Sequence, residues 1–301
     1  MLTRCPYTLK PLNEIEETSR EHIILDSLGG PDGYSVAACR RENNELGRTV
    51  DAAFQAEPLV AMFSSKVGVK TRGGVAAWTL PGELVDGSRP VEVTIPHQGA
   101  VEVFHRKPVE KDTSGKSFQI IAPPRQADRV LQELQKNLAK KGIPISEPVV
   151  KQSPNQTIRA QLTLDCTVMS SGLMKIAYLA CCELLGDSFL DDPLNPEWQK
   201  AIRARTAEDA AKVRIHGSSF DGATDCANAV LPRLGEHEHG IAILNLHGLG
   251  VVVAVRLFGC DLLTVVAQAS ETSDHGVAAG RGEILICDAR GGPIRRTRIQ
   301  L

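Results

Sequence analysis

The sequence predicts an α+β protein in which a small N-terminal module precedes a larger domain with a mostly antiparallel sheet. Two observations support this fold class. Near residue 70 the apolar pattern changes from helical to alternating, and short runs separated by Gly, Pro and Asp begin. Residues 240–288 then contain three or four strand-like runs. We place the boundary after residue 62, which gives the domains 1–62 and 63–301.

The composition is that of an ordinary folded protein. Of the 301 residues, 42% are hydrophobic and 23% are charged, enough for a sizeable core. The net charge of −2 means that any affinity for nucleic acid must come from local patches. No apolar run approaches about 18 residues, and the start lacks an apolar leader segment. We therefore expect a soluble cytoplasmic protein with no membrane partner and with reduced cysteines.

Helices and strands are predicted from apolar periodicity. Within residues 41–55, Leu46, Val50 and Phe54 share one helical face. A second, amphipathic helix should end at Gly142. Strand-like runs occupy residues 73–80, 91–96, 100–106, 116–124 and 157–166.

Residues 170–186 predict a buried central helix, because apolar side chains surround it on all sides. Its serines could cap the start, and Gly186 should end it. Lys175 lies in this apolar segment, where a charge must snorkel, pair or line a cleft. We interpret Lys175 as a snorkelling or paired structural lysine, with a phosphate contact as the alternative.

Four short blocks near the N-terminus carry the residues with the clearest chemistry. They read CPYT from Cys5 to Thr8, EHII from Glu21, LGG ending at Gly30, and CRRENNELG from Cys39, followed by Asp51. These blocks resemble the HNH endonuclease family, in the branch with C-x-x-C, then E-H-I-I-P-x-x-L-G-G, then C-x-x-C-N-x-x-L-G-x-x-x-D. The resemblance covers about residues 5–54.

The resemblance implies a ββα-metal module that hydrolyses phosphodiester bonds in DNA. His22 would be the general base that activates water, and Glu21 would hold one divalent ion, Mg²⁺ or Mn²⁺. Asn43 would be the other metal ligand, with Asn44 as the alternative because the register is uncertain by one residue. Gly29 and Gly30 would form the turn that lets the backbone double back.

The chain departs from the family pattern at the two cysteine pairs. Thr8 and Glu42 stand where the second cysteine of each pair is expected, so a zinc site with four thiolates is impossible. Cys5, Cys39 and Glu42 are the residues left for a mixed metal site. The loss of one ligand from each half argues instead that packing replaced a structural zinc.

Local basic residues are the candidate contacts to nucleic acid, because guanidinium groups suit phosphate oxygens. Three lie within the suspected nuclease module and three in the C-terminal tail: Arg40, Arg41, Arg48, Arg295, Arg296 and Arg298. The expected partner is DNA, with RNA not excluded. Cleavage of both strands would need two sites, which favours a homodimer.

Two classes of function therefore stand side by side. The first is a metal-dependent HNH endonuclease with a role in restriction or phage defence. The second is a non-catalytic nucleic-acid-binding or ligand-sensing protein with a degenerate HNH module, which the missing cysteines favour. Elsewhere in the chain, His237 and His239 would share a face on a strand and could chelate a metal, although their surroundings equally suit an exposed turn.

Overall fold

The computed structural model describes residues 2–71, 73–85, 90–99, 101–105, 108–111, 117–120, 122, 124–143, 149, 157–213, 216–219 and 222–301. The chain forms two compact units, one of residues 1–76 with 164–301 and one of residues 77–163. The units therefore do not divide after residue 62 as expected. The N-terminal residues share one hydrophobic core with the C-terminal ones, so the two segments fold together. The predicted α+β class is confirmed, with antiparallel strand pairing throughout the described sheets.

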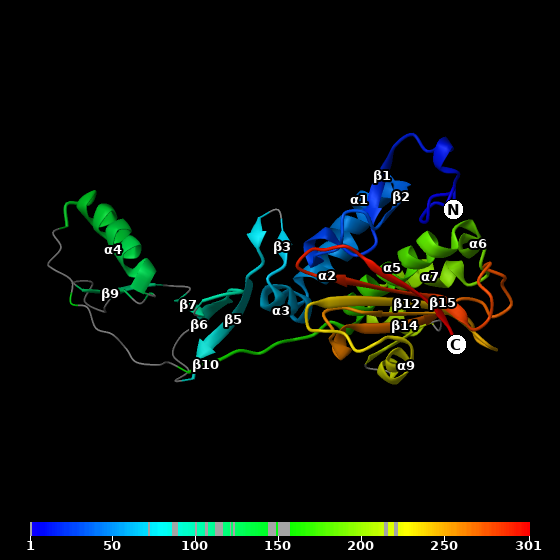
Figure 1. The fold of residues 1–301 in the computed structure, drawn as a ribbon. Coiled ribbons are helices and arrows are strands. Elements are labelled where there is room, and N and C mark those ends of the chain that lie inside the picture. The colour runs from blue at the N-terminus through cyan, green and yellow to red at the C-terminus, as the bar shows by residue number, and fades with distance from the viewer. Residues whose placement is uncertain are drawn as a thin grey trace. The chain divides into compact units, whose positions relative to one another are not determined.

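The first unit begins with two strands followed by a helical segment (Figure 1). Strand β1 (Thr18–His22) pairs antiparallel with β2 (Ser35–Cys39). The helical segment then comprises α1 (Arg40–Leu46), the π-helical turn η3 (Gly47–Asp51), α2 (Ala52–Ala56) and α3 (Pro58–Val67). Leu46, Val50 and Phe54 are all buried, which confirms the predicted helical face. This face anchors the segment in the shared core.

Between β1 and β2 the chain turns through the short 3-10 helix η2 (Asp26–Leu28) and the predicted glycine pair. Gly29 has a φ of 81°, in the left-handed region that favours glycine. A side chain on Gly30 would meet the carbonyl oxygen of Ile24. The predicted turn is confirmed, and both glycines are needed because backbone approaches them closely.

Helix α5 (Cys166–Leu185) is the predicted central helix of the unit. Asp165 caps it by accepting the backbone N–H groups of Thr167 and Val168, so the helix starts ahead of the serines and the predicted serine cap is wrong. Its predicted end at Gly186 is confirmed. The helix is long and apolar enough to cross a membrane, but most of it is buried inside the protein, which is consistent with a soluble protein.

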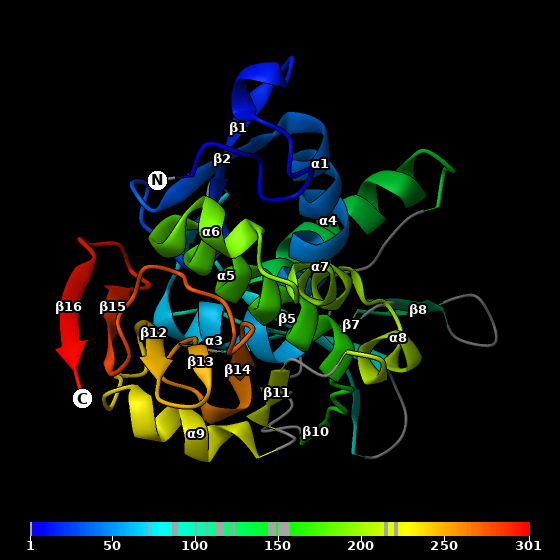
Figure 2. The same ribbon diagram turned by 90° about the vertical axis from the view of Figure 1, so that its right-hand side faces the viewer.

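A six-stranded sheet forms the other half of the first unit, and it includes the predicted C-terminal strands. Its order is β11 (His216–Ser218), β14 (Thr264–Gln268), β13 (Gly250–Arg256), β12 (Glu238–Leu246), β15 (Arg281–Asp288) and β16 (Arg295–Gln300). Side chains alternate along β12: Ile241 and Ile243 join the α5 core, while Ala242 packs with α9 (Ala223–Val230). Figure 2 shows α5 and α9 on opposite sides of this sheet.

Smaller elements complete the first unit. They are the 3-10 helices η1 (Leu12–Glu14) and η5 (Asp261–Leu263), the strands β3 (Lys70–Thr71) and β4 (Gly74–Val75), and the helices α6 (Asp187–Leu190), α7 (Asn195–Arg203) and α8 (Ala207–Ala211). Helices α6 and α7 pack against α5.

The second unit contains the remaining predicted strands and the amphipathic helix. Its elements are β5 (Trp78–Leu84), β6 (Pro90–Ile95), β7 (Glu102–His105), β8 (Val109–Lys111), β9 (Phe118–Ile120), α4 (Pro124–Ala139) and β10 (Ile158–Arg159). The predicted strand over residues 157–166 is correct only at β10. Its pairing with β5 stops after two residues, and the chain then leads into α5.

Candidate functional site

A cavity of about 390 Å³ lies beside β1 and brings together three of the residues predicted from the sequence. Glu21, His22 and Asn43 all line it, together with Asp51. Asn44 is exposed and does not belong to the lining, so Asn43 is the asparagine of this cavity. The cavity lies entirely within the first unit.

Strand β1 and helix α1 supply the three predicted side chains of this cavity. Glu21 pairs across the hairpin with Val36 and is buried, whereas the next residue, His22, pairs with Ser35 and is only partly buried. Asn43 lies in α1, and its Nδ2 donates to the hydroxyl of Ser19 at 2.9 Å and to the carbonyl of Arg20 at 3.1 Å. These hydrogen bonds fasten the start of α1 to β1.

The imidazole of His22 differs from the neighbouring side chains in having no hydrogen-bond or ion-pair partner in the part of the chain that the structure describes. The side chain nevertheless lines the cavity. Glu21 and Asn43 likewise each keep one oxygen, Oε2 and Oδ1, that accepts no hydrogen bond in the described part of the chain. These atoms remain available to a ligand.

Lys175 places a positive charge behind the cavity wall. Its ammonium lies 2.5 Å from Oε1 of Glu21, and 2.7 and 2.6 Å from the two carboxylate oxygens of Asp51. The Lys175 side chain is 2% exposed. The interpretation as a paired lysine is confirmed, and both of its partners come from the N-terminal module.

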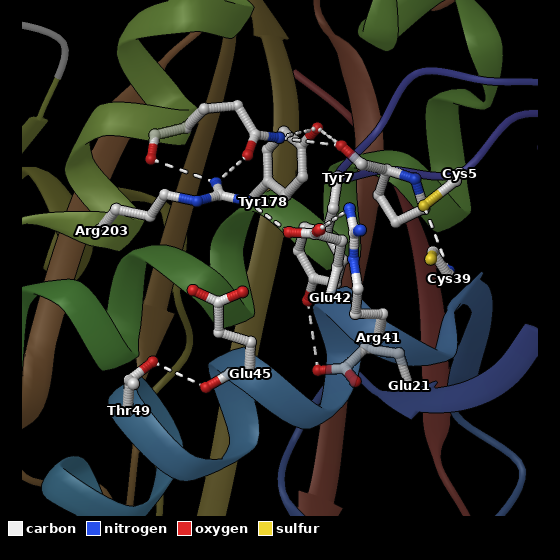
Figure 3. A network of polar contacts seen from close by, with 12 residues as sticks. Cys5, Tyr7, Glu21, Cys39, Arg41, Glu42, Glu45, Thr49, Tyr178 and Arg203 are labelled. Atoms are coloured by element: carbon white, nitrogen blue, oxygen red, sulfur yellow. Dashed lines mark hydrogen bonds and ion pairs between the residues drawn. The ribbon is translucent and has the colours of Figure 1, made fainter.

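Two residues of this cluster were assigned no role from the sequence. Tyr7 donates its hydroxyl to Oε1 of Glu21 at 3.2 Å, as Figure 3 shows. Asp51 accepts hydrogen bonds from the Lys175 ammonium through both carboxylate oxygens. The sequence carries a signal for Asp51, because it lies eight positions after Asn43 and therefore two helical turns along the same face. No comparable local signal points to Tyr7.

Burial sets the electrostatics of the cluster. It raises the pKa of both the Glu21 and the Asp51 carboxyls, and the Lys175 ammonium opposes that rise. Burial together with the charge on Glu21 also raises the pKa of the Tyr7 hydroxyl. A single ammonium cannot compensate two carboxylates. When both are ionised, the cluster carries one net negative charge, which favours a cation in the cavity.

The donor atoms fit a hard divalent cation. Within the described residues, no three His, Cys, Asp or Glu side chains are gathered to hold a metal ion. Mg²⁺ does not require such a cage, since it binds through one or two protein carboxylates and keeps several waters or substrate phosphates. The free oxygens of Glu21 and Asn43, beside a net negative charge, are the donor type that Mg²⁺ and Mn²⁺ prefer.

Within the residues that the structure describes, Cys5, Cys39 and Glu42 are not gathered into a metal site. The backbone N–H of Cys39 donates to the sulfur of Cys5 at 3.2 Å, and both thiols are free. Glu42 instead pairs with Arg41 at 3.1 Å and with Arg203 at 3.7 Å (Figure 3). Guanidinium groups therefore compensate the charge of the Glu42 carboxylate. The replacement of a structural zinc by packing stays a prediction.

Most of the arginines expected to contact nucleic acid are paired within the protein. In the N-terminal module, Arg40 lies 3.3 Å from Glu17, and Arg41 pairs with Glu42. Arg48 is exposed, and we find no partner for it in the described part of the chain.

The three candidate arginines of β16 likewise include two that are paired within the protein and one that is exposed. Arg295 pairs with Glu238, and Arg296 lies 2.7 Å from Glu183. Arg298 is exposed and has no partner among the residues described. Arg48 and Arg298 therefore remain the most available of the six for an external phosphate.

Arg20 is a candidate that sequence reasoning missed. It lines the cavity beside His22, and its Nε donates to the hydroxyl of Ser35 at 3.3 Å. Its Nη2 donates to the carbonyl oxygen of Asp32. These contacts hold the guanidinium near the cavity, where its remaining N–H groups can meet an anionic ligand.

Comparison with protein-family models, with curated proteins and with solved structures found no match to this chain.

Proposed function

We propose that this protein is a metal-dependent endonuclease that hydrolyses phosphodiester bonds in DNA. The proposal is supported above all by His22, whose imidazole shares one cavity with Glu21 and Asn43 and has no partner among the described residues. Hydrolysis of a phosphodiester needs a base for the attacking water and positive charge near the phosphate. The cavity contains side chains suited to both tasks.

Each residue has a separate task in this proposal. His22 takes a proton from the attacking water. Glu21 and Asn43 hold the divalent ion, which when bound would neutralise negative charge on the phosphate and the leaving oxygen. Arg20 would contact a phosphate oxygen through its guanidinium. The hydrogen bonds from Asn43 to β1 keep the amide oriented without the ligand.

The wider setting follows from the same proposal. DNA is the proposed substrate, with RNA as the alternative that a cleavage assay separates. We propose a cytoplasmic protein that acts in restriction or phage defence. Cutting both strands would require two copies of the site and therefore a homodimer.

A nicking assay on supercoiled plasmid tests the proposal. Wild-type protein should nick the plasmid with Mg²⁺ or Mn²⁺ and leave it intact with EDTA. His22→Ala should lower the nicking rate at least about 100-fold, the low end of the contribution expected from a general base. His247→Ala, in an exposed turn, is the control and should keep the wild-type rate. Equal rates for wild type and His22→Ala, or no nicking with any metal and substrate, would overturn the proposal.

A second function is favoured by one observation, the position of Lys175. Its ammonium already contacts Glu21 and both carboxylate oxygens of Asp51. Such an arrangement suits a site that binds a ligand without catalysing a reaction. On this alternative the protein binds nucleic acid or a small ligand without cutting it. Isothermal titration with Mn²⁺ separates the two functions, since the nuclease should bind the ion and Glu21→Gln should abolish that binding.

A further inference from the structure

The candidate site is built from two distant stretches of sequence. Glu21 and Asp51 lie in the N-terminal module, whereas Lys175 belongs to α5. Helix α5 packs directly against the turn η3, which carries Asp51, and against β2 of the hairpin. The N-terminal module therefore does not contain all the charges that surround its own cavity.

The contacts of Lys175 are those of a counter-ion. Its ammonium is within 2.7 Å of oxygens from both carboxylates and is shielded from solvent. Buried ions of like sign close together repel strongly and need a partner of opposite charge. Without Lys175, the two carboxylates would lie together in the interior with no cation beside them in the described part of the chain.

We propose that Lys175 is a positioning residue whose ammonium occupies the place of a cation between Glu21 and Asp51. The wild-type site therefore has room for a divalent ion only on the cavity side, at Glu21 and Asn43. The inference rests on the proposed cation site. It adds a charge contact to the hydrophobic core that joins the N-terminal module to the C-terminal residues. It also predicts that removal of the ammonium creates a stronger site for a divalent ion between the two carboxylates.

Thermal unfolding with and without Mn²⁺ tests this inference on the full chain. Lys175→Met keeps most of the side-chain volume and removes the charge. In EDTA the variant should melt below the wild type. Mn²⁺ should raise its melting temperature at least about twice as much as that of the wild type, because the ion now binds where the ammonium was. Lys200→Met, on an exposed lysine of α7, is the control and should show the wild-type increase.

A double variant keeps the test decisive if Lys175→Met folds poorly. Lys175→Met combined with Asp51→Asn removes one charge of each sign. If Lys175 acts through its charge, the double variant should be more stable in EDTA than Lys175→Met alone and should lose the extra stabilisation by Mn²⁺. Equal Mn²⁺ effects in Lys175→Met and wild type, or a double variant no more stable than Lys175→Met, would overturn the inference.

These measurements are separate from nuclease activity. If plasmid nicking fails while Mn²⁺ preferentially stabilises Lys175→Met, the role of Lys175 stands and the proposed activity falls. If nicking depends on His22 but Lys175→Met shows no added response to Mn²⁺, the proposed activity stands and the role of Lys175 falls.

Discussion

The Nε2 atom of His239 lies 2.8 Å from the carbonyl oxygen of Leu28. This hydrogen bond joins β12 to the glycine turn that follows Glu21 and His22. The Nδ1 atom of His239 accepts the backbone N–H of Phe258 at 3.2 Å, so the imidazole is neutral, with its proton on Nε2. His239 is a fully buried strand residue, which contradicts the exposed-turn interpretation of this histidine. Both of its ring nitrogens already bond backbone groups, which contradicts the metal-binding interpretation.

His239 should make the fold sensitive to acid. Burial lowers its pKa from 6.5 to about 4. Above pH 6.5 the side chain is neutral in both states and its contribution is fully present. As the pH falls from 6.5 towards 4, only the unfolded chain takes up the proton, so stability falls by up to about 3 kcal/mol. Urea unfolding at pH 7.5 and 4.5 measures the loss.

His239→Gln provides the comparison for this pH effect. The amide cannot titrate, so the variant should lose less stability than the wild type between pH 7.5 and 4.5. His247→Gln, in an exposed turn, should behave as the wild type does. An identical loss in His239→Gln and wild type would show that other groups cause the acid sensitivity.

Gly29 should tolerate no side chain. A Cβ atom at this position would lie 1.8 Å from the carbonyl oxygen of Ala289, and the positive φ is unfavourable for alanine. Gly29→Ala should therefore cost about 2 kcal/mol or more in the free energy of unfolding. Gly33→Ala is the matched control in the same loop. A Cβ atom there meets nothing within 4 Å, and its effect should stay within about 0.5 kcal/mol. Similar losses in the two variants would contradict the close approach of Ala289.

The two neighbouring asparagines should behave differently. Asn43 lines the cavity and is bonded to β1, whereas Asn44 is exposed outside it. Under the proposed function, Asn43→Ala should lower Mn²⁺ affinity and nicking at least about tenfold, because it removes one oxygen ligand and loosens α1. Asn44→Ala should leave both unchanged. Titration calorimetry and the plasmid assay measure these effects, and the reverse ranking would assign the ligand to Asn44.

Under the proposed function, Arg20 should contribute to nucleic-acid affinity more than Arg40. Arg20 lines the cavity, whereas Arg40 pairs with Glu17 and lies outside it. Arg20→Ala should weaken DNA binding and lower the slope of log affinity against log salt by about 1, because one phosphate contact is lost. Arg40→Ala should change neither by a comparable amount. Fluorescence anisotropy at several salt concentrations provides the measurement. Equal effects of the two substitutions would place the nucleic acid elsewhere on the surface.

The sequence by itself determined the local structure of the N-terminal module. The spacing of Leu46, Val50 and Phe54 predicts the buried helical face, because helical periodicity acts over a few turns. The adjacency of Glu21 and His22 and the glycine pair are local features as well, and the structure contains the predicted turn. The assignment of nuclease activity to these residues stays a prediction.

Only the tertiary structure decided which groups surround Glu21. Lys175 and Tyr7 reach it from different parts of the chain, and His239 reaches the glycine turn from a strand of the C-terminal sheet. The boundary after residue 62 was wrong as a division between compact units for the same reason, because α5 completes the N-terminal core. Periodicity reports which face of an element is buried. It does not report which distant helix covers that face, and that choice decides which charge meets a buried carboxylate.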